Sequence, residues 1–177
     1  TFGGLQNEWL FGLQQTADGG YILAGFTNSD STGNITQAIW DTLLATDDYW
    51  MIKTDAAGNK QWDKRFGGTS YDYLVDMQQT TDGGYILGGR SYGGANGDKS
   101  DPTHDTTSML YAQGDYWIVK TDSLGNKQWD KSFGGCDADL LNAVRQTPDG
   151  GYILGGFTSS DSCGDVSEHT KGFADAW

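Results

Sequence analysis

Asp82-Gly-Gly-Tyr-Ile-Leu87 decides the fold, because the same six residues recur at positions 18–23 and 149–154. Phe-Gly-Gly recurs in step with them, beginning at Phe2, Phe66 and Phe133. Asp-Tyr-Trp occurs at Asp48 and Asp115, and returns as Asp-Ala-Trp at Asp175. A repeat of this length indicates one supersecondary unit that is copied in tandem.

The second copy predicts four antiparallel strands. Residues 74–80 and 85–89 are short apolar runs, joined by Thr-Asp-Gly-Gly, which favours a hairpin turn because glycine tolerates positive φ. A long polar loop covers residues 91–114. Residues 116–121 are apolar on both faces, which predicts a buried strand, and a further turn leads to a strand at 127–133.

Such a unit fits an all-β fold, either a β-propeller blade or one coil of a β-solenoid, and the length of the repeat favours the propeller. The copies divide the chain into blade repeats at 1–65, 66–132 and 133–177. A propeller closes with about 4–8 blades. We therefore expect the chain to be a piece of a larger propeller, with its third blade lacking a last strand, or to be completed by neighbouring chains.

The charge balance restricts the partners. A net charge of −13 at pH 7 disfavours nucleic acid and anionic membranes, which both need a basic surface. No apolar run is long enough to span a bilayer. Cys136 and Cys163 lie in the third copy only, and the sequence leaves open a disulfide or two free thiols.

Residues 55–62 and 122–129 share the pattern Asp-x-x-Gly-Asn-x-x-Trp. This pattern resembles the blade motif of quinoprotein-type propellers, and it is loosely similar to the Asp-box turn of sialidases. The order of motifs along the whole repeat resembles repeats in large secreted and cell-surface proteins of Bacteroidota and some archaea. That resemblance implies an extracellular or cell-surface propeller, and it supplies no catalytic residues.

The copies differ most between the second and third strands, in loops 28–47, 91–114 and 159–174. Insertions at one point of each repeat lie on one face, which is often the binding face. The spacing of Ile39-Trp40 and Leu43-Leu44 predicts one or two helical turns, with Met109 to Tyr111 as a shorter counterpart. Trp9, Trp40 and Tyr111 are the candidate ligand-binding residues, because the two tryptophans do not recur and suit stacking on a sugar ring.

The same loops contain a recurring Gly-Asn or Gly-Asp pair with an aspartate upstream. Alternating carboxylate, amide and hydroxyl oxygens suit Ca²⁺, although Asx turns explain the pattern as well. The candidate calcium ligands are Asp30, Asn34, Asp98, Asp161 and Asp165.

Recurring polar residues point to structure. Glu8, Asp72 and Asp139 follow each Phe-Gly-Gly, and threefold recurrence favours turn capping over catalysis. His104 and His169 lack the spacing of a zinc site.

The sequence therefore predicts a non-enzymatic extracellular scaffold or recognition module for a glycan or protein ligand. The alternatives are a structural subunit of a surface layer or filament, and part of a propeller hydrolase whose catalytic residues lie elsewhere.

Overall fold

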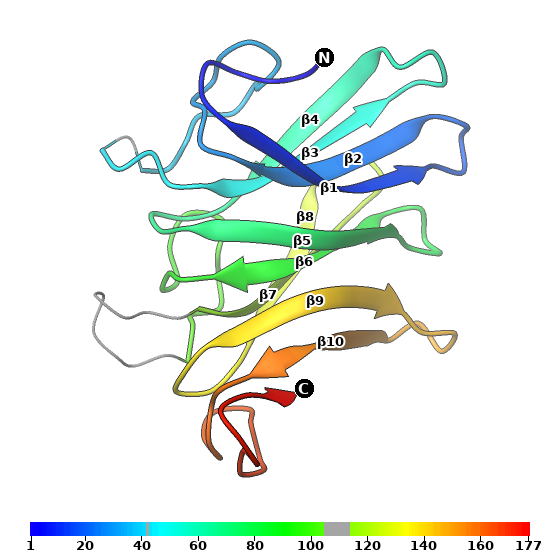
Figure 1. Cartoon of the computed structure of the whole chain (residues 1–177). Coiled ribbons are helices and arrows are strands. Elements are labelled where there is room, and N and C mark those ends of the chain that lie inside the picture. Colours follow the sequence, from blue (N-terminus) through cyan, green and yellow to red (C-terminus); the bar gives the residue numbers. More distant parts are fainter. Residues whose placement is uncertain (42, 105–113) are drawn as a thin grey trace.

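The computed structural model describes residues 1–41, 43–104 and 114–177. Within these residues the chain is all-β, with antiparallel pairing throughout and no helix (Figure 1). The predicted all-β class and the four-stranded antiparallel unit are confirmed. The described strands form three separate sheets, and none of these sheets closes on itself.

Each sheet is a meander in which strands adjacent in sequence are hydrogen-bonded neighbours. The first sheet contains β1 (Glu8–Gln15), β2 (Tyr21–Thr27), β3 (Asp48–Thr54) and β4 (Lys60–Phe66). The second contains β5 (Asp72–Gln79), β6 (Tyr85–Ser91), β7 (Asp115–Thr121) and β8 (Lys127–Phe133). The third contains β9 (Asp139–Gln146), β10 (Tyr152–Thr158) and β11 (Asp175–Ala176).

The Asp-Gly-Gly segment forms the hairpin turn that its sequence predicts. In the second sheet Gly83 has a φ of +82°, which a residue with a side chain rarely adopts. Asp82 Oδ1 accepts hydrogen bonds from Thr80 Oγ1 at 2.5 Å and from the Gly84 amide at 3.0 Å. The aspartate therefore locks the turn that sets the register of β5 against β6.

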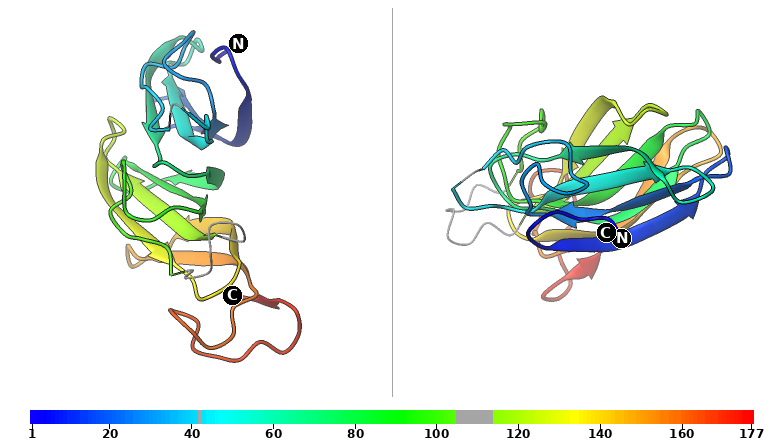
Figure 2. Two further views of the ribbon diagram at one scale, coloured as in Figure 1. Left: turned by 90° about the vertical axis from the view of Figure 1, so that its left-hand side faces the viewer. Right: turned by 90° about the horizontal axis from the view of Figure 1, so that it is seen from above.

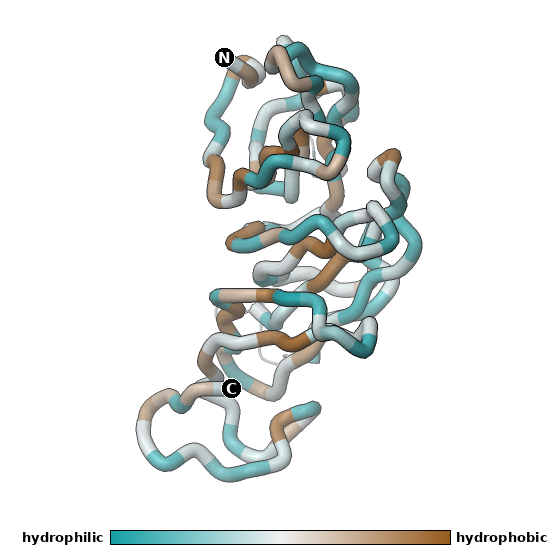
Figure 3. The backbone as a smooth tube through the Cα atoms, turned by 90° about the vertical axis from the view of Figure 1, so that its right-hand side faces the viewer, coloured by the Kyte–Doolittle hydropathy of each residue, from teal (hydrophilic) through white to brown (hydrophobic). Residues whose placement is uncertain are grey.

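The sheets pack face to face along an arc (Figures 1 and 2). β2 contacts β5, and β6 contacts β9, so that the two interfaces join corresponding strands. Apolar segments lie along the strands between the sheets, and the loops are mostly hydrophilic (Figure 3). The larger core lies between the first two sheets and contains Ile22, Ala24, Tyr49, Met51, Phe66, Leu74, Met77, Tyr85, Leu87, Trp117 and Val119.

The recurring Gln-Gln pair explains how successive sheets are held together. Gln14 Oε1 accepts from the Gln79 amide at 2.8 Å, and Gln79 Oε1 accepts from the Ala17 amide at 3.0 Å. The next interface repeats both bonds between Gln78, Gln146 and Thr81. The first glutamine thus reaches forward to the next sheet, and the second reaches back.

A buried tyrosine makes a third repeated contact. The Tyr49 hydroxyl donates to the Trp117 carbonyl oxygen at 2.9 Å, and the Tyr116 hydroxyl donates to the Trp177 carbonyl oxygen at 3.3 Å. The first and second sheets therefore have a forward face that carries the tyrosine, and the second and third sheets have a backward face that carries the acceptor.

Cys136 and Cys163 form a disulfide, with their Cα atoms 5.9 Å apart. In the first two copies a hydrogen bond joins the corresponding positions. Thr32 Oγ1 accepts from the Leu5 amide at 3.1 Å, and Asn96 Oδ1 accepts from the Thr69 amide at 2.7 Å. The disulfide therefore replaces a repeated contact between the Phe-Gly-Gly turn and the following loop.

The described residues of the first loop contain no helix, and one isolated turn is found where one or two helical turns are predicted. Leu43 and Leu44 donate their amides to Asp41 Oδ1, and the Ala45 amide donates to the Asp41 carbonyl oxygen. Ala45 then takes a φ of +48°, which ends the turn before a helix forms. The counterpart at Met109 to Tyr111 lies outside the described residues. The described residues contain no helix with the length and apolar character that a membrane crossing requires.

Candidate functional site

The three variable loops leave the sheets at one common end. They join β2 to β3, β6 to β7, and β10 to β11. In Figure 1 this end lies to the left, and the hairpin turns lie to the right. The connections from β4 to β5 and from β8 to β9 also lie at the loop end. Residues near the starts of β1 and β5 therefore lie close to the variable loops.

An aromatic cluster spans the first two sheets at this end. We use the term for Trp9, Phe11, Phe26, Tyr71, Tyr73 and Tyr92. The Phe26 ring lies at its centre, with its centroid 4.9 Å from Trp9, 5.4 Å from Phe11 and 4.9 Å from Tyr73. Because Tyr73 belongs to the second sheet, this contact joins the two sheets.

The second half of the cluster continues beyond Tyr73. Tyr71 stacks on Tyr73 with a centroid separation of 5.8 Å and an interplanar angle of 11°. Tyr92 meets Tyr73 edge to face at 5.9 Å. The Arg90 guanidinium carbon lies 5.0 Å from the Tyr73 centroid and 5.8 Å from the Tyr92 centroid, within the range of a cation–π contact.

Polar groups without partners border the cluster. Thr46 and Asp47 are buried. Among the described residues, Thr46 Oγ1, Asp47 Oδ1 and Arg90 Nε are buried atoms with no hydrogen-bond partner. One carboxylate oxygen of Asp48, Asp72, Asp115 and Asp139 is unpartnered in the same way, so such atoms are not confined to this region.

Burial sets the protonation of this region. It raises the pKa of Asp47, against the opposing effects of a hydrogen bond from Tyr73 and the charge of Arg65. Burial also raises the pKa of Tyr73 to about 12, with Asp47, Tyr92 and Tyr71 adding to the shift and Arg90 opposing it. Tyr73 therefore remains a neutral hydroxyl near pH 7.

The cluster occupies positions at which the copies differ. Trp9 corresponds to Tyr73 and to Leu140, whereas Phe26 corresponds to Arg90 in the second copy and recurs as Phe157 in the third. Tyr71 corresponds to Asn7 in the first copy. The repeat frame does not need aromatic residues here, because the third sheet forms without most of them.

Trp40 and Asp98, predicted separately as a ligand-stacking residue and a metal ligand, lie together. Trp40 Nε1 donates to Asp98 Oδ2 at 3.0 Å, joining the first variable loop to the second. They border a pocket of about 390 Å³, whose lining also includes Gln37, Ile39 and Arg65. One face of the half-exposed Trp40 is thus available beside a carboxylate.

The other predicted calcium ligands do not gather in one place. Asn34 Oδ1 accepts from the Gly3 amide, and Asp165 Oδ2 accepts from the Gly134 amide. Asp30 Oδ1 accepts from the Ser31 and Ile39 amides. Asp161 pairs with His169.

Across the described part of the chain, no group of three His, Cys, Asp or Glu side chains is placed to hold a metal ion. Calcium binding stays a prediction.

The recurring acid after Phe-Gly-Gly has the structural role that its recurrence predicts. Asp72 Oδ2 accepts from the Gly68 amide at 2.9 Å, and Asp139 Oδ2 accepts from the Gly135 amide at 2.7 Å. Glu8 instead accepts from Ser29 Oγ at 2.5 Å.

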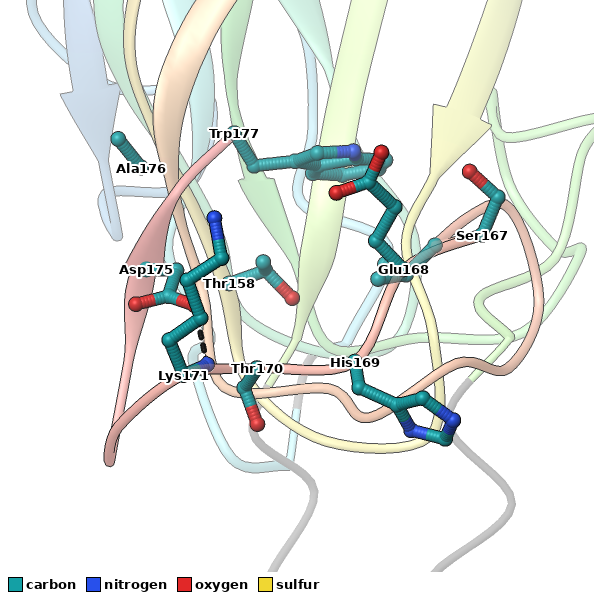
Figure 4. A pocket seen from close by; sticks show the side chains of 10 residues that line it. Thr158, Ser167, Glu168, His169, Thr170, Lys171, Asp175, Ala176 and Trp177 are labelled. Carbon is teal, nitrogen blue, oxygen red and sulfur yellow. Dashed lines mark hydrogen bonds between the residues drawn. The ribbon is translucent and has the colours of Figure 1, made fainter.

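A pocket of about 440 Å³ lies in the third variable loop (Figure 4). Ser167 and Trp177, which line it, correspond to Ser100 and Trp117 in the second sheet. There, Asp130 on β8 accepts from the Ser100 amide at 2.9 Å and from Trp117 Nε1 at 3.0 Å. The pocket thus lies where an outer strand packs in the other sheets, and we assign it no ligand.

No protein-family model matches the chain, and no curated protein matches it. The function therefore has to be inferred from the contacts within the molecule.

Sequence reasoning found Trp9 and missed the rest of the cluster. Phe11, Phe26, Tyr73 and Tyr92 lie on or beside strands and look like core residues in a linear reading. Aligning the copies position by position carries part of the missing signal, because Phe11 and Tyr92 lie at positions where the other copies have no aromatic residue. Tyr111 lies outside the described residues.

Proposed function

We propose that this chain is an extracellular recognition module built from β-propeller blades, which binds a glycan or protein ligand at the loop end. The observation that carries the proposal is the partly exposed aromatic cluster beside three loops of unequal sequence. Exposed aromatic rings beside a few polar groups are typical of binding sites. The disulfide between Cys136 and Cys163 is consistent with an oxidising compartment.

The repeated interface supports the propeller arrangement. The Gln-Gln bonds and the tyrosine bond recur between successive sheets, so the same asymmetric contact is used twice. A repeated asymmetric contact generates a ring when its rotation closes.

Further blades fit the backward face of the first sheet. Leu10 and Leu13 are 55% and 66% exposed there, whereas Leu74 and Met77 at the same positions are 0% and 6% exposed. This contrast favours a preceding blade, in the same protein or in a neighbouring chain.

Binding to glycan and protein arrays, followed by mapping with hydrogen exchange, tests the recognition function. We expect protection at the loop end, and weaker binding when Trp40→Ala removes the contact between the first two loops. Trp129→Ala, on β8 near the hairpin end, is the matched control. Protection confined to the hairpin end, or no ligand on either array, would contradict the proposal.

A structural subunit is the second candidate, because Leu10 and Leu13 leave an apolar face exposed. Electron microscopy of the purified chain tests it. Ordered rings or filaments that are lost with Leu10→Ser and Leu13→Ser would favour assembly as the function.

A further inference from the structure

We infer that a pocket beside Trp50, on the backward face of the first sheet, binds a tyrosine side chain presented by a further sheet of this repeat. The pocket has a volume of about 280 Å³, and its lining includes Leu10, Leu23, Gly25 and Trp50. Drug-sized ligands occupy about 300–1,000 Å³, so this smaller space suits a single side chain. The inference extends the propeller arrangement proposed above, and it is independent of the ligand at the loop end.

The corresponding space in the other two sheets holds a tyrosine. In the second sheet the Tyr49 ring lies 4.8 Å from the Trp117 ring, and its hydroxyl donates to the Trp117 carbonyl oxygen. In the third sheet Tyr116 makes the same two contacts with Trp177, at 4.9 Å between ring centroids. Because Trp50 corresponds to Trp117 and Trp177, the two filled copies identify the occupant of its pocket.

The apolar walls of the pocket recur as well. Leu74 and Leu87 are fully buried in the second sheet and share a core with Tyr49. Leu10 and Leu23 occupy the same positions in the first sheet, where Leu10 is more than half exposed. A ring that fills the pocket removes this apolar surface from water, which favours binding.

A glycine clears the space for the hydroxyl group. A Cβ atom on Gly89 would lie only 2.7 Å from the Tyr49 hydroxyl oxygen. Gly89 pairs with Trp117 across β6 and β7, and Gly25 pairs with Trp50 across β2 and β3. The acceptor carbonyl of Trp50 therefore has the same setting as that of Trp117.

Phe2 already makes the contact that accompanies the tyrosine. Phe66 pairs with Tyr49 across β3 and β4, and both side chains pack in the core that contains Trp117. Phe2 corresponds to Phe66, packs against Trp50 and lines the pocket. The first sheet thus has the phenylalanine of this pair in place, with the pocket beside it.

The third sheet of a second copy does not match the pocket. Ala176 stands in the third sheet where Tyr116 stands in the second, so its forward face offers no ring. Pro148 also lacks the amide hydrogen that Thr81, at the same position, donates to Gln146 of the next sheet. The occupant is therefore a sheet of this repeat that carries the tyrosine.

Titration of the ¹⁵N-labelled chain with p-cresol, which has the ring and hydroxyl of a tyrosine side chain, tests the pocket. We expect the Trp50 indole signal to shift and those of Trp117 and Trp177 to stay in place, because tyrosines already fill their pockets. Leu10→Ser is expected to weaken the binding by about fivefold. Ile153→Ser is the matched control, because Ile153 is 61% exposed on β10 and does not line the pocket.

Tyr49→Ala opens the corresponding pocket in the second sheet. We expect p-cresol to shift the Trp117 signal in this variant and to raise its melting temperature, because the ring refills the cavity. The titration of the wild-type chain does not depend on the folding of this variant.

A Trp50 signal that p-cresol leaves in place would overturn the inference. Equal shifts of the Trp50, Trp117 and Trp177 signals in the wild type, or unchanged binding in the folded Leu10→Ser variant, would overturn it as well. A ligand that protects the loop end in hydrogen exchange would in each case leave the recognition function standing.

Discussion

At the scale of single residues, buried charges are compensated differently in each copy. Arg65 Nε donates to Asp48 Oδ2 at 2.7 Å, and both side chains are almost fully buried. In the second sheet Ser132 stands in place of Arg65, and the buried Lys99 stands in place of Ile35. The Lys99 ammonium lies 5.7 Å from the Trp117 ring and interacts with the charges of Asp72 and Asp115.

Arg65→Met removes the donor to Asp48 Oδ2 and to the carbonyl oxygens of Ser29 and Thr27, and leaves these buried acceptors without that partner. Breaking a buried pair on one side costs about 3–5 kcal/mol. Chemical denaturation measures this loss in the free energy of unfolding. Lys131→Met is the control, because Lys131 is exposed, and its free energy of unfolding is expected to stay within about 0.5 kcal/mol of wild type. A loss of similar size in both variants would contradict the assigned role of the pair.

Stability is expected to fall as the pH rises from about 4 to about 7. Burial raises the pKa of Asp72 to about 7 and that of Asp115 to about 6. The folded protein therefore holds protons that the unfolded chain releases near its ordinary pKa of about 4. This stabilisation is full below the unfolded pKa and is lost as the pH passes the folded value.

Thermal unfolding at pH 5 and pH 7.5 measures the effect, at about 2–4 °C for each kcal/mol. Asp72→Asn removes a group that ionises, so the melting temperature of this variant is expected to change less between the two pH values. If the melting temperature of this variant changed with pH as much as that of the wild type, groups other than Asp72 would control the pH dependence.

At the scale of elements, the strands and hairpins follow from the sequence because glycine and aspartate leave few alternatives at their turns. Asp82 and Gly83 fix the hairpin turn between β5 and β6 in the way that their residue types predict. The loops do not follow, because side chains far along the chain bind their backbone. The Thr36 amide donates to Asp63 on β4, for example, and no local pattern reveals that contact.

The candidate site could likewise be predicted only in part from the sequence. Trp9 was identifiable because it does not recur, whereas its contact with Phe26 depends on the register of β1 against β2. The Gln-Gln pairs were visible in the sequence, but their forward and backward roles required the packing of the sheets.

Leu74 and Leu10 occupy the same position in two sheets and provide a matched pair. Leu74→Ala is expected to cost about 2–5 kcal/mol, because the side chain is buried between sheets. Leu10→Ala is expected to cost well under half as much, since its side chain faces solvent. Urea unfolding of the two variants compares them directly. Equal losses would mean that the backward face of the first sheet is covered.

At the scale of the whole molecule, the two ends of the sheets have different roles. The hairpin end carries repeated residues that lock turns and join sheets. The loop end carries residues that differ between copies, including the aromatic cluster and Trp40. The forward face of the third sheet also differs, because Arg145, Pro148 and Ala176 replace residues that bridge the other interfaces. Under the proposed function, the repeated contacts hold the frame together and the residues that differ at the loop end bind the ligand.

The tryptophan indole region of a ¹⁵N–¹H correlation spectrum tests this division most directly, because the chain has 7 tryptophans at both kinds of position. When a ligand found on the glycan or protein arrays is titrated in, we expect the indole signals of the non-recurring Trp9 and Trp40 to shift most. The signals of the recurring Trp50, Trp62, Trp117 and Trp129 are expected to stay in place. Shifts confined to those recurring tryptophans, with Trp9 and Trp40 unmoved, would contradict it.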